Sequence, residues 1–196
     1  MNRHLQIATL ILGLVCCSCN NDKGNNANLT TNDSSTISSK QTSKVLGKKY
    51  FDYDEIVYYF NNIEEDKLSE LYDNQSKTEI DSFKMGIILG DIPESVSDLV
   101  FIDKLEKVGY KKTLIDKSKF DEIDKIFIEK TTTDNIATSC IYVYRDILIF
   151  KKNSKVVGTA KVCFGCMANE IKGTEANTEN FGQDGDYDKL WKLIRQ

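Results

Sequence analysis

The sequence predicts an α+β fold with a helical N-terminal half, a C-terminal antiparallel β-meander and a closing terminal helix. Apolar residues recur at helical spacing between about residues 53 and 127. From about residue 137 the pattern changes to short runs of β-branched and aromatic residues separated by turn residues, which is typical of strands. The length of 196 residues accommodates one globular domain of roughly 150 residues and an N-terminal extension.

Five helical segments are expected before the strands. The first covers residues 53–63, where Tyr53, Ile56 and Phe60 are spaced to share one face behind a capping Asp52. The others are expected near residues 68–72, 80–88, 101–108 and 120–127. The turn at residues 90–93 should end the third segment and Gly109 the fourth.

The strands are expected at residues 140–144, 146–150, 155–162 and 167–171, with a turn at residues 152–154. A last helix should follow, capped by Asp186. Its apolar residues, Tyr187, Leu190, Trp191 and Ile194, lie at the spacing of one helix face, so this helix should pack on the sheet.

The N-terminal sequence predicts an export signal. Residues 5–15 form an apolar run of eleven residues behind Arg3, which is shorter than the roughly 20 residues that a transmembrane helix needs. Cysteines then stand at the expected cleavage point, and a polar stretch begins at once. This arrangement resembles a bacterial lipoprotein signal, which implies cleavage and attachment of diacylglycerol and palmitate at Cys19, with Cys17 as the alternative. A plain export signal with incidental cysteines is the other interpretation.

Residues 20–44 are expected to form a disordered tether, because 15 of these 25 residues are Asn, Ser or Thr and too little apolar surface is present to offset the cost of ordering. The predicted organisation is therefore a signal peptide at 1–19, a tether at 20–44 and a single domain at 45–196. The expected location is the bacterial cell envelope, with the domain held on a membrane by its lipid and facing the periplasm or the cell surface.

Composition excludes several classes of function. The formal net charge is −4, so the chain has no basic surface of the kind that nucleic-acid binding requires. His4 is the only histidine and lies in the predicted signal, which removes histidine-dependent catalysis and histidine metal sites. No glycine pattern matches a phosphate-binding loop. We therefore expect no catalytic residues, no metal and no cofactor, and a non-catalytic protein is favoured over an enzyme.

Two further segments contain candidate ligands. The acidic run from Asp184 to Asp188 lacks the glycine and glutamate of a calcium-binding EF-hand loop, and it is better explained as a helix start. Arg145 lies at the head of a predicted strand, where it could bind an anion or form an internal ion pair between the sheet and the helices. The ion pair is the favoured interpretation.

The three cysteines of the domain are the one candidate for chemistry. Cys163 and Cys166 form a Cys-x-x-Cys pair after a strand, and Cys140 lies on a predicted neighbouring strand. Three interpretations remain open: a structural disulfide between Cys163 and Cys166, a redox-active pair, or a soft-metal site that includes Cys140. A hairpin is expected after Cys166, whereas thioredoxin-type enzymes place this motif at the start of a helix. Cys140 could also be a small buried apolar residue.

Residues 140–166 resemble a pattern in small uncharacterised bacterial lipoproteins of the Bacteroidetes type: a cysteine, a strand that begins with arginine, and Cys-Phe-x-Cys. The resemblance implies that Cys140, Arg145, Cys163 and Cys166 belong to one group, without implying an activity. The functional hypothesis is a membrane-anchored envelope lipoprotein that binds an unknown protein partner. The alternative is a thiol-based redox or metal-binding protein that uses the three cysteines.

Overall fold

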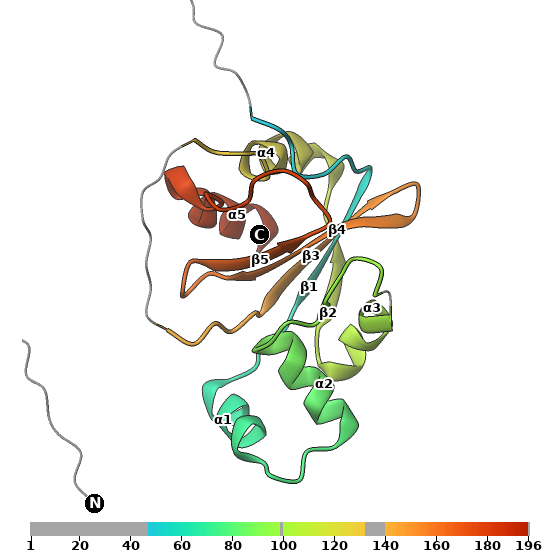
Figure 1. Ribbon diagram of the computed structural model, residues 1–196, viewed down its shortest axis with the longest axis vertical. Coiled ribbons are helices and arrows are strands. Elements are labelled where there is room, and N and C mark those ends of the chain that lie inside the picture. Colours follow the sequence, from blue (N-terminus) through green and yellow to red (C-terminus); the bar gives the residue numbers. More distant parts are fainter. Residues whose placement is uncertain (1–46, 99, 132–139, 196) are drawn as a thin grey trace, which may run out of the picture. The chain divides into compact units, whose positions relative to one another are not determined.

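The computed structural model describes residues 47–98, 100–131 and 140–195, all within one compact unit, Ser43–Gln196. The expected signal peptide with Cys17 and Cys19, and the expected tether, lie outside these residues. In the described part, five α-helices accompany a five-stranded antiparallel sheet (Figure 1), which confirms the α+β class.

The sheet has the strand order β2-β1-β3-β4-β5, and all neighbouring strands are antiparallel. Its strands are β1 (Glu55–Phe60), β2 (Lys111–Leu114), β3 (Asp146–Lys152), β4 (Lys155–Cys163) and β5 (Ala168–Lys172). The last three strands form the predicted meander, and the predicted turn at residues 152–154 joins the first two of them. Strands β1 and β2 extend this meander on the side of β3.

The helices confirm most of the predicted segments. They are α1 (Glu65–Asp73), α2 (Glu79–Ile88), α3 (Val100–Leu105), α4 (Phe120–Ile126) and α5 (Asp186–Ile194), with short 3-10 turns at Glu106–Val108, Lys117–Lys119 and Gln183–Gly185. Gly109, with a φ of 97°, ends the helical segment of α3 and the following 3-10 turn, as predicted for residues 101–108, since glycine adopts this left-handed conformation without steric cost. No helix within the described ranges is long and apolar enough to cross a membrane.

The predicted helix at residues 53–63 is wrong, because residues 55–60 form β1. All four central residues of this strand, from Ile56 to Tyr59, are buried, so both of its faces pack against protein. A strand that is buried on both faces has a continuous apolar run instead of an alternating one. Periodicity alone cannot distinguish such a run from a buried helix.

The predicted strand at residues 140–144 is also wrong. This segment leads into β3 without pairing to another strand, and Ile141 and Tyr142 are exposed. The backbone of Tyr144 is satisfied by other partners: its N–H donates to the carbonyl of Ile88 at 2.9 Å, and its carbonyl accepts from the Tyr110 hydroxyl at 2.6 Å. These bonds hold the segment to the end of α2 and to the residue before β2, and not to a neighbouring strand.

Each face of the sheet supports its own apolar core. On one face, Ile56, Leu148 and Phe150 pack with residues of α4 and α5. On the other face, Val57 and Ile149 pack with residues of α2 and α3. The sheet is therefore the middle of three layers (Figure 1): α4 and α5 cover one face, and α2 and α3 cover the other.

A buried lysine attaches the end of α2 to the sheet. Lys161 of β4 is 1% exposed, and its ammonium donates to the carbonyls of Ile87, Gly90 and Ile92. It also pairs with Glu170 of β5 at 2.6 Å. Burial lowers the pKa of Lys161, and the neighbouring Glu170 opposes this shift. A cation at the C-terminal end of a helix satisfies carbonyls that have no partner within the helix.

Strand β2 forms one edge of the sheet. Among the described residues it pairs only with β1, and all four of its residues are exposed, including Lys111 and Lys112. Leu114, at the end of the strand, is 66% exposed.

A second buried charge attaches the C-terminus to the sheet. Asp146, the first residue of β3, is 1% exposed and accepts hydrogen bonds from the Tyr58 hydroxyl and from two nitrogens of Arg195, at 3.0 Å and 2.6 Å. The Arg195 guanidinium also lies 4.2 Å from the centre of the Phe60 ring. Such a forked arginine–carboxylate pair fixes geometry that a lysine cannot reproduce.

Replacement of Arg195 should destabilise the domain. We expect Arg195→Gln to lower the free energy of unfolding by about 2–4 kcal/mol, because Asp146 would stay buried without its cation. Urea unfolding of the two proteins measures this difference. The matched control is Lys67→Gln, which breaks an exposed pair with Glu70 and should change stability by about 0.5 kcal/mol or less. Equal effects of the two substitutions would contradict the role given to Arg195.

Candidate thiol and disulfide site

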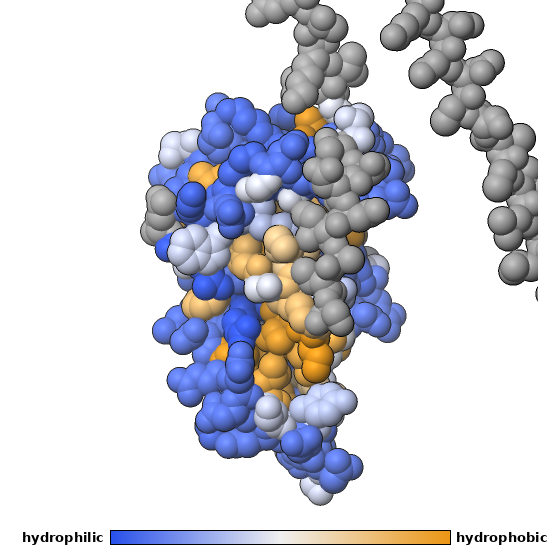
Figure 2. All heavy atoms as spheres, turned by 90° about the vertical axis from the view of Figure 1, so that its left-hand side faces the viewer, coloured by the Kyte–Doolittle hydropathy of each residue, from blue (hydrophilic) through white to orange (hydrophobic). Residues whose placement is uncertain are grey.

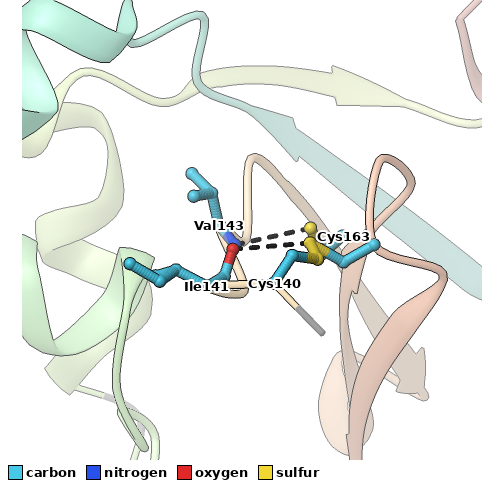
Figure 3. The surroundings of a disulfide bond; sticks show 5 residues. Cys140, Ile141, Val143 and Cys163 are labelled. Atoms are coloured by element: carbon cyan, nitrogen blue, oxygen red, sulfur yellow. Dashed lines mark hydrogen bonds between the residues drawn. A yellow bond between two sulfur atoms is a disulfide. The ribbon is translucent and has the colours of Figure 1, made fainter. Parts of the chain in front are cut away.

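The three domain cysteines come together at one end of the β4–β5 hairpin. Cys163 is the last residue of β4, Cys166 lies in the turn before β5, and Cys140 begins the segment that leads into β3. A disulfide joins Cys140 to Cys166, with a Cα–Cα distance of 6.2 Å and a sequence separation of 26 residues (Figure 3). The disulfide therefore ties the 140–145 segment to the hairpin.

One of the three interpretations, a structural disulfide between Cys163 and Cys166, is wrong, because Cys166 pairs with Cys140 and Cys163 is a free, buried cysteine. Cys163 is paired in register with Ala168, so it belongs to the hairpin ladder, and Cys166 occupies the turn beyond it. The 140–145 segment passes beside this turn and brings Cys140 to Cys166. Sequence spacing contains no information on that neighbour.

Two of the three cysteines, Cys163 and Cys166, are buried. Tyr144, Cys163 and Cys166 form a small buried cluster, and Ala168 packs against it. The backbone N–H of Val143 donates to Sγ of Cys163 at 3.4 Å, as Figure 3 shows. Burial raises the pKa of Tyr144 to about 12, with a smaller contribution from the charge of Glu170. The site is thus shielded on the side of Cys163 and open on the side of Cys140, which is exposed.

Two features of the Cys-x-x-Cys motif are relevant to the redox and metal interpretations: its position between two strands and the bonding of its sulfur atoms. The motif lies in a turn between two strands, as the sequence predicts, so the N-terminal end of a helix does not activate either sulfur. Two of the three sulfurs are consumed by the disulfide, and a disulfide sulfur is not a thiolate ligand. Among the described residues, no group of three or more His, Cys, Asp or Glu side chains is placed to hold a metal ion.

Arg145 lies directly before β3 and donates from Nε to the carbonyl of Ile63 at 3.2 Å. Its own carbonyl accepts from the N–H of Asn61. Within the described ranges Arg145 forms no ion pair, whereas Arg195 forms the pair that joins a helix to the sheet. Arg195 had no distinguishing signal in the sequence, because its partner Asp146 lies 49 positions away.

The acidic run from Asp184 to Asp188 opens α5. Gly185 takes the capping position that was predicted for Asp186, which becomes the first residue of the helix. Asp186 is buried and pairs with Lys130 at 2.9 Å. A buried carboxylate at a helix start is stabilised by the helix dipole as well as by this cation.

Exposed large side chains lie next to the disulfide cysteines in the sequence and on α1. We define the disulfide-side surface by Tyr72, Ile141, Tyr142 and Met167, whose exposed fractions are 64%, 77%, 44% and 43%. A shallow pocket of about 180 Å³ lies within it, lined by residues that include Leu68, Leu89 and Ile141. Figure 2, which views the side that carries the 140–145 segment, shows apolar side chains gathered on this face. Sequence patterning did not reveal this surface, because the segment was assigned to a strand.

Comparison with known proteins finds no match to this chain among protein-family models, curated proteins or solved structures.

Removal of the disulfide should destabilise the domain. We expect the double substitution Cys140→Ala and Cys166→Ala to lower the free energy of unfolding by about 3 kcal/mol, because the bond closes a loop of 26 residues. Urea unfolding with and without reductant measures this change: reductant should weaken the native protein by the same amount and leave the variant unaffected. As a control, Cys163→Ala should cost about 1 kcal/mol. A larger loss from Cys163→Ala than from the double substitution would contradict the pairing.

Proposed function

We propose that the protein is an exported lipoprotein that is anchored to a membrane of the bacterial cell envelope and binds a protein partner. Two independent features support export. The N-terminal sequence has the pattern of a lipoprotein signal, and the domain contains a disulfide, which persists in oxidising compartments outside the cytosol. The resemblance of residues 140–166 to small bacterial lipoproteins agrees with this location.

The anchor is tested by labelling cells with a palmitate analogue. We expect Cys19→Ser to abolish incorporation of the label and to release the domain from the membrane fraction, because the acceptor thiol is absent. Cys16→Ser, three residues away, is the matched control and should leave labelling unchanged. Labelling that survives Cys19→Ser and is lost with Cys17→Ser would move the anchor to Cys17, and labelling that survives both would overturn the proposal.

The observation that supports a binding role is the disulfide-side surface. Ile141 and Tyr142 expose apolar side chains from a segment that is covalently attached to the hairpin at Cys140. Contiguous apolar patches on a protein surface mark sites of interaction, and a segment that is already ordered loses little conformational entropy on binding. The partner that fits such a surface is a protein with a complementary apolar patch.

A photo-crosslinking amino acid at position 141 tests the binding proposal in intact cells. We expect a discrete protein adduct from position 141 and none from position 114, because Leu114 is similarly exposed but lies on strand β2, at the edge of the sheet. Tyr142→Ser and Met167→Ser should weaken the adduct from position 141. Equal adducts from both positions, or none from either, would contradict a specific surface.

A further inference from the structure

A free thiol lies beside a disulfide in this domain, and neither the membrane anchor nor the binding surface uses it. Cys163 is 4% exposed and belongs to the same buried cluster as Cys166, whose sulfur is bonded to Cys140. In Figure 3 the side chains of Cys140 and Cys163 converge on one place beside the backbone of residues 141–143. A thiolate in contact with a disulfide can exchange with it through attack on one sulfur.

We propose that Cys163 exchanges the disulfide within the chain. The Cys163 thiol loses its proton, and the thiolate attacks Sγ of Cys166. A Cys163–Cys166 bond forms as the Cys140–Cys166 bond breaks, and Cys140 leaves as a thiolate that takes up a proton. One disulfide and one thiol are present before and after, so the step needs no oxidant or reductant.

The second bond would lie within the turn of the hairpin. Cys163 is paired with Ala168 across the ladder, and only Phe164 and Gly165 separate it from Cys166 in the turn. No described side chain lies within 4 Å of a Cβ built on Gly165, so this turn has room to adjust. The N–H of Val143 points at the Cys163 sulfur, the atom that must carry negative charge during the attack.

Exchange changes both the reactivity and the tethering of the site. The free thiol moves from a buried position to Cys140, which is exposed, where it can react with a disulfide or electrophile in solution. The segment that carries Ile141 and Tyr142 loses its covalent link to the hairpin. The inference does not depend on a membrane anchor or on a partner protein, and its failure would leave both of those proposals intact.

Tryptic peptides distinguish the two bonds. Cleavage after Lys130, Arg145, Lys161 and Lys172 places Cys140 on the peptide 131–145 and both other cysteines on the peptide 162–172. The Cys140–Cys166 bond links the two peptides. The Cys163–Cys166 bond leaves them separate, with the second peptide two hydrogens lighter than its dithiol form.

The experiment uses the full chain with Cys16→Ser, Cys17→Ser and Cys19→Ser, so that Cys140, Cys163 and Cys166 are the only cysteines that can be labelled. The folded, non-reduced protein is incubated with N-ethylmaleimide between pH 7 and 9, quenched in acid, digested and analysed by mass spectrometry. We expect time-dependent labelling of Cys140 together with unlinked, oxidised 162–172. The rate should rise with pH, since the thiolate is the attacking form, and should fall about tenfold or more in Cys163→Ala.

A second variant keeps the test independent of how Cys163→Ala folds. Cys140→Ser leaves only Cys163 and Cys166 in the domain, and we expect these two to form a disulfide on air oxidation of the folded protein. Labelling confined to Cys163, labelling at Cys166, labelling of Cys140 at the same rate in Cys163→Ala, or two persistent thiols in Cys140→Ser would each overturn the proposal.

Discussion

Strand β3 is the element on which the rest of the domain depends. It pairs with β1 on one edge and β4 on the other, and its residues from Asp146 to Phe150 are buried. Each face of this strand therefore needs a cover, which the two sets of helices provide. Because both cores meet at β3, a change in its register would disrupt the packing on both sides of the sheet at once.

Buried charges complement this apolar framework at its ends. Asp146 fixes the start of β3 to the C-terminal Arg195, and Lys161 fixes β4 to the carbonyls that follow α2. Each charge has several hydrogen-bond partners, which is the condition under which burial of a charge is tolerated. These contacts orient elements that apolar packing alone would position only loosely.

The sequence predictions were correct for features that depend on residues close in the sequence, and wrong for features that depend on contacts between distant residues. Helices α1 to α4 were predictable because their apolar stripes and turn residues, such as Gly109, are local signals. Strand β1 was not, since burial on both faces removes the alternation that identifies a strand. The cysteine pairing failed for a related reason: the neighbour of Cys166 lies 26 residues away and depends on the path of the 140–145 segment. The hairpin and the presence of a disulfide followed from local patterns, whereas the choice of its partner required the tertiary fold.

Strand β2 is an edge of the sheet in the described part of the chain, and this has a consequence for behaviour at high concentration. An unpaired strand edge offers backbone groups on which another polypeptide can add a strand, and this is a common start of fibril growth. Lys111 and Lys112 lie on β2, and the strand is only four residues long. Two copies that approached edge to edge would bring like charges together over a short ladder, so this edge resists self-association even where molecules crowd.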